Sequence, residues 1–289
     1  MKKKRTFLHL LFLIALFSLL PLLHPKTVSA AGTVSYKIKG TIDYTKSYEC
    51  LKDINTLRES KGLKPLKMDK RLLKYAVQRC AEITAALSHT RPNGKDMTSL
   101  NRSLISGENL ASGYLTTELT FNAWRNSPGH YKNMTRADYK SAGLACFEYN
   151  GECYWVNLFS KKSAKAVTKS GTVKAARKIQ ISKKYLKKKN LGTNLNRVSV
   201  GSNITLPVTL QGVKGQPNTG FIGNTLFTYK SSNPSVLAVT KSGLLKPLRE
   251  GKANITIQLK ADKKVRKSFK INVYGGGGSN IDKYSIVAE

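Results

Sequence analysis

The sequence predicts a mixed α+β domain followed by an all-β sandwich. Helical spacing of apolar residues comes first along the chain, and alternating strand patterns separated by turn residues come later. Charge divides the chain as well. Residues 46–160 carry 17 Lys or Arg against 11 Asp or Glu, whereas residues 161–274 carry 25 against 2. We therefore expect two domains with different surfaces.

The first 30 residues have the pattern of a secretory signal peptide. Lys2 to Arg5 form a basic start, Phe7 to Leu20 form an apolar run, and Val28-Ser29-Ala30 places small residues at a cleavage site. The apolar run is shorter than the roughly 20 residues that span a bilayer. We expect a secreted or extracellular protein with no transmembrane segment in the mature chain.

Two helices are expected at the start of the first domain, which we place at 46–160. Leu51 and Ile54 mark one face of the first helix, and Gly62 ends it. Asp69 can cap the second helix, whose apolar stripe runs over residues 72–87. This spacing places His89 just beyond the end of the second helix.

A third helix is expected from Thr117 through Trp124. Ser127-Pro128 then has the pattern of a cap and first position of a further helix, with His130 in its first turn. Two strands follow at 141–149 and 152–159. Helices come first and strands last in this domain.

The four cysteines are even in number, and an exported chain meets oxidising conditions. A four-residue loop between the last two strands would place Cys146 opposite Cys153, whereas a two-residue Asn-Gly turn would shift the register and separate the sulfurs. We expect the Cys146–Cys153 disulfide, which leaves Cys50–Cys80 as the second pair. Zinc binding by four thiolates is the alternative, but short Cys-x-x-Cys spacing is missing.

Residues 161–190 contain 12 basic residues and no acidic one, which is typical of a solvated basic linker. Short strand patterns fill the second domain at 191–274, beginning with the alternation from Val198 to Leu210. Residues 275–289 open on four glycines and are expected to form a flexible tail.

Three polar side chains carry the chemistry of the first domain. His89, Glu108 and His130 are the type of ligand set found in an open zinc site, and the same groups can exchange protons with a substrate. Structural roles are the alternatives: His89 beside a helix C-terminus, Glu108 as a turn or capping acceptor, and His130 as a hydrogen-bonded first-turn residue.

Four motifs in order resemble the bacterial, SCP-like extracellular branch of the CAP superfamily, which is related to cysteine-rich secretory proteins, antigen 5 and plant pathogenesis-related proteins. The motifs are Ser-His-Thr-Arg-Pro-Asn-Gly at 88–94, Gly-Glu-Asn-Leu-Ala at 107–111, Ala-Trp with Ser-Pro-Gly-His-Tyr-Lys-Asn-Met within 123–134, and Tyr-Trp-Val-Asn-Leu-Phe at 154–159. The resemblance implies a three-layer α-β-α sandwich. It also implies a cleft lined by His89, His130 and Glu108 that holds a divalent metal in some members.

One acidic residue of the family pattern is missing. Many eukaryotic relatives carry a second glutamate shortly after the tryptophan of the third helix, but here Trp124 is followed by Arg125. A single carboxylate holds a dication less well. We therefore expect at most a weak zinc or calcium site, with Asn109 and Ser127 as accessory oxygen donors.

The second domain resembles the bacterial Ig-like group 2 domains of surface proteins, through Tyr-Lys-Ser-Ser-Asn-Pro-Ser-Val-Leu-Ala-Val at 229–239 and Glu-Gly-Lys-Ala-Asn-Ile-Thr-Ile at 250–257. The resemblance implies an adhesion or spacer role. Its positive charge predicts contact with anionic cell-envelope polymers, and therefore cell-wall association. No recognition helix or aromatic stacking motif indicates a specific nucleic acid.

The predicted function is that of a binding protein whose cleft accepts a small lipid, peptide or glycan. The alternative is a weak divalent-metal-dependent hydrolase that uses the same three residues. A serine hydrolase is disfavoured because no Gly-x-Ser-x-Gly elbow is present. We expect no catalytic activity in the favoured interpretation.

Overall fold

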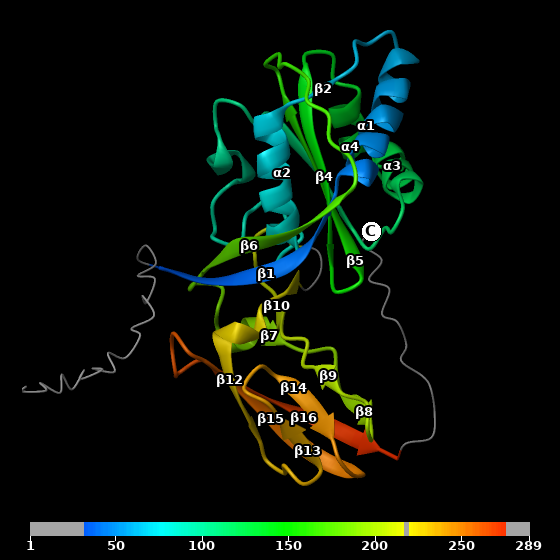
Figure 1. Ribbon diagram of the computed structural model, residues 1–289. Helices are drawn as coiled ribbons and strands as arrows, with labels where there is room; N and C mark the ends of the chain where they lie inside the picture. The colour runs from blue at the N-terminus through cyan, green and yellow to red at the C-terminus, as the bar shows by residue number, and fades with distance from the viewer. Residues whose placement is uncertain (1–31, 217–219, 276–289) are drawn as a thin grey trace, which may run out of the picture.

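The computed structural model describes residues 32–216 and 220–275 (Figure 1). The predicted signal peptide lies outside these ranges, as does the predicted tail beyond Gly275. Within them, no helix has both the length and the apolar character needed to cross a membrane.

A six-stranded sheet forms the centre of the first half, with strand order β3-β5-β4-β1-β6 and with β2 paired to β4. The strands are β1 (Thr33–Asp43), β2 (Lys67–Met68), β3 (Gly107–Ser112), β4 (Ser141–Tyr149), β5 (Glu152–Ser160) and β6 (Thr172–Ser182). β4 and β5 are buried along nearly their whole length, because helices cover the sheet on both faces.

The helices are α1 (Tyr44–Glu59), α2 (Lys70–Ile83), α3 (Thr117–Asn126) and α4 (Pro128–Met134), with a short 3₁₀ turn, η1 (Met97–Leu100). α2 packs on β4, β5 and β6, whereas α1 packs on β4 and on α3, and α3 contacts α4. In Figure 1, α2 lies on one side of β4 and α1, α3 and α4 lie on the other. The predicted α+β class and its three layers are confirmed.

Local capping follows the sequence. Asp69 accepts hydrogen bonds from the backbone N–H groups of Arg71 and Leu72, so the predicted cap of the second helix is confirmed. α2 ends at Ile83, four residues before the end of its predicted apolar stripe. The last carbonyl groups of a helix have no partner within the helix. Here the carbonyl of Thr84 accepts a hydrogen bond from the backbone N–H of Phe221, in the second half of the chain.

The predicted basic linker is wrong in its central part. Residues 172–182 form β6, which pairs with β1 over eleven residues from Thr33↔Ser182 to Asp43↔Thr172. Ile179 and Ile181 are buried, while Lys174 and Lys178 point to solvent from the opposite face. β1 also belongs to this sheet, so the first domain begins before residue 46, where it was expected to start.

The β4–β5 hairpin closes through the tighter of the two turns. Tyr149 pairs with Glu152, and Asn150 and Gly151 both have positive φ, as a two-residue turn requires. Cys146 therefore pairs with Trp155, not with Cys153, and the two cysteines lie diagonally on one face.

All four cysteines are free thiols, so neither predicted disulfide is present. For Cys50 and Cys80 the reason is topological. Cys50 lies on α1 and Cys80 on α2, and the sheet runs between these helices (Figure 1). The Cys80 thiol donates instead to the carbonyl of Ala145 in β4, at 3.2 Å.

The second half is all β, as predicted, in three small sheets of the described chain: β11-β10-β7, β12-β15-β16-β8 and β13-β14-β9. The strands are β7 (Leu191–Gly192), β8 (Arg197–Ser199), β9 (Ile204–Thr205), β10 (Thr209–Leu210), β11 (Gly220–Phe221), β12 (Phe227–Ser231), β13 (Leu237–Val239), β14 (Leu244–Pro247), β15 (Gly251–Leu259) and β16 (Arg266–Tyr274), with 3₁₀ turns η2 (Lys188–Asn190) and η3 (Asn224–Leu226). The expected alternation from Val198 to Leu210 is divided among β8, β9 and β10.

The two halves make direct contacts beside the end of α2. A Cβ on Gly220 would lie 1.9 Å from the carbonyl oxygen of Ala85, so only glycine allows this backbone approach. The hydroxyl of Ser88 donates to the carbonyl of Lys214 at 2.5 Å. The second half therefore contacts the residue immediately before His89.

Candidate functional site

The site is built around Glu108, in the edge strand β3. Its side chain is 0% exposed, and Arg79 of α2 donates from Nε to Oε1 at 2.8 Å and from Nη2 to Oε2 at 3.3 Å. His89 Nδ1 lies 2.9 Å from Glu108 Oε2. Because Glu108 acts as the acceptor for Arg79, Nδ1 is the donor in this contact, and Nε2 of His89 is left for a ligand.

Arg79 belongs to a longer buried charge network. Its Nη1 donates to Glu82 at 3.0 Å, and Arg91 binds both oxygens of the same carboxylate at 2.6 and 2.9 Å. Burial opposes ionisation of Arg79, but the charges of Glu108 and Glu82 raise its pKa above the ordinary value. Burial likewise opposes ionisation of Glu82, but Arg91 and Arg79 lower its pKa. The network holds the carboxylate of Glu108 in one hydrogen-bonded position.

His130 lies in the first turn of α4, as predicted, and is partly buried. Burial lowers its pKa, and the nearby charge of His89 lowers it further. His130 is therefore favoured in the neutral form. His89 binds Glu108, and the next residue of β3, Asn109, donates to the carbonyl of His130, so both histidines lie at the same edge of the sheet.

Asn109 holds α4 against the sheet edge and does not face a ligand. Its side-chain amide donates to the carbonyl of His130 at 3.1 Å and accepts from Asn133 at 2.9 Å, and it is 0% exposed. Successive strand residues point to opposite faces, so Glu108 meets α2 while Asn109 meets α4. The site forms where these two layers meet at the edge strand.

The remaining predicted residues lie at the margin of the site. Ser127 occupies the N-cap position of α4, but its side chain makes no capping hydrogen bond there, and Pro128 follows at the first helical position. Arg125 is exposed, and its guanidinium lies 5.7 Å from the centre of the Phe121 ring. Arg125 therefore packs along its own helix.

One known family matches part of the first half of the chain. The model of the cysteine-rich secretory protein family, CAP, matches residues 51–159. Residues 51–159 form a CAP domain. His89, Glu108 and His130 all lie within it.

Relatives of the CAP domain differ from this chain in length and sequence. The uncharacterized protein YkwD of Bacillus subtilis (strain 168) is 30% identical over 143 residues, which is 47% of this chain and 51% of that protein. This chain therefore spans about half the length of that relative.

Solved structures with some similarity come from several bacteria. An extracellular protein containing a SCP domain from Bacillus anthracis str. Ames is 21% identical, over 40% of each chain, with a TM-score of 0.36. An outer surface protein from Borrelia burgdorferi is 25% identical, over 46% of this chain and all of that one, with a TM-score of 0.35. TM-scores this low assign no function.

Glu108 is poorly placed to bind a divalent metal directly. Both of its oxygens already accept hydrogen bonds from Arg79, and one also binds His89, so a dication that bound the carboxylate would have to displace a buried guanidinium. Within residues 32–216 and 220–275, no group of three or more His, Cys, Asp or Glu side chains is arranged to hold a metal ion.

Arg79, Glu82 and Arg91 form the charge network beside the candidate site but were not among the predicted site residues. Arg79 and Glu82 lie among the buried positions of α2, beside Cys80 and Ile83. Charged residues almost never occupy fully buried positions unless they are paired. Two opposite charges three residues apart within an apolar helix were the available signal.

Proposed function

We propose that the CAP domain acts outside the cell as a binding module, with His89 and His130 as hydrogen-bonding groups for a small lipid, peptide or glycan. One observation carries the proposal: Glu108 is buried, and both of its carboxylate oxygens accept hydrogen bonds from Arg79 or His89. Such a carboxylate orients an imidazole well but offers a metal ion little. The proposed role does not include catalysis.

The arrangement suits recognition of hydroxyl or amide groups. The side chain of His89 is 60% exposed although its Nδ1 is fixed by Glu108, so its Nε2 is presented in a defined direction. His130, held neutral, offers one donor and one acceptor nitrogen according to its tautomer. Because the ring of His89 is already held in one direction, it loses little side-chain entropy when it binds a polar ligand.

The extracellular location and the retention of the protein form the second part of the proposal. The predicted signal peptide supports export, and the motifs at 229–239 and 250–257 support an Ig-like spacer in the second half. The positive charge of residues 161–274 supports attachment to anionic envelope polymers. Release of the protein from cell walls should rise with salt, because the contact is mainly Coulombic. Release that does not change with salt would argue against retention by charge.

Nitrogen NMR of the imidazole rings tests the binding role. Soluble peptidoglycan fragments and a short-chain phosphatidylglycerol are titrated separately into the ¹⁵N-histidine-labelled mature protein. We expect one probe to shift the ring signals of His89 and His130. Because the mature His89→Ala/His130→Ala variant has no histidine ring to observe, its binding is followed by calorimetry, and we expect it to be lost. Lys132→Ala, an exposed change on α4, is the matched control and should bind normally. Failure of every probe to shift either ring would reject the proposal.

Zinc and calcium titrations test the alternative, a metal-dependent hydrolase. We expect no metal binding that depends on the two histidines. Calorimetric zinc binding to the native protein that disappears in His89→Ala/His130→Ala would establish a metal site and reopen the hydrolase function.

A further inference from the structure

A row of lysines occupies one face of the β1–β6 ribbon. Cross-strand pairing places Lys37 opposite Lys178, Lys39 opposite Ala176, and Thr41 opposite Lys174. Directly paired residues share a face, and so do alternate residues along a strand. Lys37, Lys39, Lys174 and Lys178 therefore point the same way, and all four are exposed.

The opposite face of the ribbon is apolar and packed. Tyr36, Ile38, Ile179 and Ile181 are buried there, and β6 contacts α2. The ribbon is thus held rigidly, and its lysine side is the face left to solvent. A rigid display of charge loses less entropy on binding than a mobile linker would.

These lysines have no counter-charge within the described chain. None of the four forms an ion pair with a described residue, and Lys37 and Lys178 are like charges in direct opposition, an arrangement that destabilises a sheet. Two carboxylates lie further along the same face of the sheet: Glu148, which is paired with Thr41, and Asp43. Both already bind Lys46, at 2.7 and 3.8 Å.

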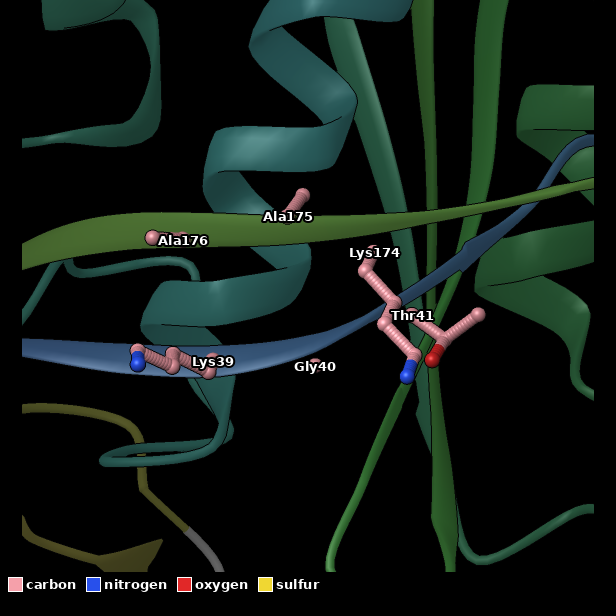
Figure 2. Close-up of a pocket in the computed structure, with 6 residues that line it drawn as sticks. All are labelled: Lys39, Gly40, Thr41, Lys174, Ala175 and Ala176. Carbon is pink, nitrogen blue, oxygen red and sulfur yellow. The ribbon is translucent and has the colours of Figure 1, made fainter.

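A shallow groove lies along the same ribbon. It has a volume of about 390 Å³ and is lined by Lys39, Gly40, Thr41, Lys174, Ala175 and Ala176 (Figure 2). Figure 2 shows Lys39 and Thr41 on β1 and Lys174 on the adjoining β6. The small residues between the lysines leave the backbone open, so a thin chain can lie against it.

We propose that the lysine face of β1–β6 binds a linear polyanion of phosphodiester-linked small polyols. From the Lys37/Lys178 row to the Thr41/Lys174 row the face extends four residues, roughly 13 Å at the rise of a strand. Lysine side chains spaced along such a line can each contact one of the successive phosphates of a single polymer chain. The other residues on this face, such as Thr41, Ala176 and Gln180, are not aromatic, so the face has no platform on which nucleic-acid bases stack.

This inference deepens the proposed envelope retention, on which it rests, and assigns the contact to the β1–β6 ribbon of the six-stranded sheet. The test uses fluorescently labelled poly(glycerol phosphate) and the full mature protein, with binding measured at several salt concentrations. We expect Lys37→Gln/Lys39→Gln/Lys174→Gln/Lys178→Gln to weaken binding at least about 10-fold at low salt and to reduce the slope of log affinity against log salt by about 3.

A matched variant separates this face from total charge. Lys230→Gln/Lys246→Gln/Lys252→Gln/Lys270→Gln removes four exposed strand lysines from the second half, and we expect it to bind within about threefold of the native protein. Replacing the four ribbon lysines with arginine should preserve binding. Unchanged far-UV circular dichroism and thermal melting confirm that the glutamine variants fold.

Each contrary outcome has a distinct meaning. Absence of polymer binding by the native protein would reject both envelope retention and the ribbon surface. Loss of binding in the second-half variant alone would keep retention but overturn the ribbon surface, and equal loss in both variants would show attraction by net charge only. Tighter binding of single-stranded DNA with the same number of phosphates would overturn the assignment to a polyol polymer.

Discussion

The guanidinium of Arg79 lies 2.8 Å from Oε1 of Glu108, and neither side chain is exposed to solvent. This contact joins the inner face of α2 to the edge strand β3 and fixes the carboxylate that orients His89. It therefore joins two layers of the CAP domain and positions the candidate site.

Replacing Arg79 with methionine should destabilise the protein strongly. The change leaves the carboxylates of Glu108 and Glu82 buried without their shared partner, which costs about 3–5 kcal/mol in the free energy of unfolding. Urea unfolding followed by fluorescence measures this loss. Lys74→Met, an exposed change on the same helix, should stay within about 0.5 kcal/mol of the native protein. Similar stabilities for the two variants would contradict the role of Arg79.

The titration of His130 should be displaced to acid. Burial and the charge of His89 lower its pKa below the ordinary value of 6.5. A base whose pKa is lower in the folded state contributes stability that is complete above the unfolded pKa and is lost as pH falls toward the folded pKa. Stability should therefore fall as pH drops below 6.5. Proton NMR titration should show a higher midpoint for His130 in His89→Gln, because one of its two causes is removed; an unmoved midpoint would contradict the proximity of the two rings.

Mild oxidation should distinguish the two cysteine pairs. Interaction with the neighbouring thiol of Cys146 lowers the pKa of Cys153, and the charge of Lys46 lowers it further. Glutathione disulfide should therefore link Cys146 to Cys153 and leave Cys50 and Cys80 reduced, because the sheet separates the latter pair. Mass spectrometry of peptides digested without reduction measures the linkage. A cross-link between Cys50 and Cys80 would contradict the topology.

Gly143 should tolerate no side chain. A Cβ there would lie 2.1 Å from the backbone carbon of Leu72 in α2 and 2.4 Å from the nitrogen of Leu73. Gly143→Ala should therefore lower the melting temperature, with a loss of about 1–3 kcal/mol or more from forced separation of helix and sheet. Gly129→Ala is the matched control, because nothing lies within 4 Å of its Cβ position and alanine favours the helix. A melting temperature as high in Gly143→Ala as in Gly129→Ala would show that the helix can move away at little cost.

Local sequence patterns were sufficient for most elements. The Asp69 cap, the helix beginning at Thr117 and the position of His130 in a first turn all depend on residues within a few positions of each other. β6 was missed for a different reason. A strand with one buried face exposes the other, and here Lys174, Arg177 and Lys178 make the segment so basic that the alternation of Ile179 and Ile181 is hidden.

The sequence by itself determined the class of both halves, the two strands of the final hairpin, and the candidates His89, Glu108 and His130. Only the tertiary structure decided what those candidates touch. The positions of residues 79, 89, 108 and 130 along the chain do not predict the distances between their side chains. These residues meet because α2, β3 and α4 pack together at one edge of the sheet. Which face of the sheet each helix covers decides two results. α2 places Arg79 against Glu108, and the sheet between α1 and α2 prevents a disulfide between Cys50 and Cys80.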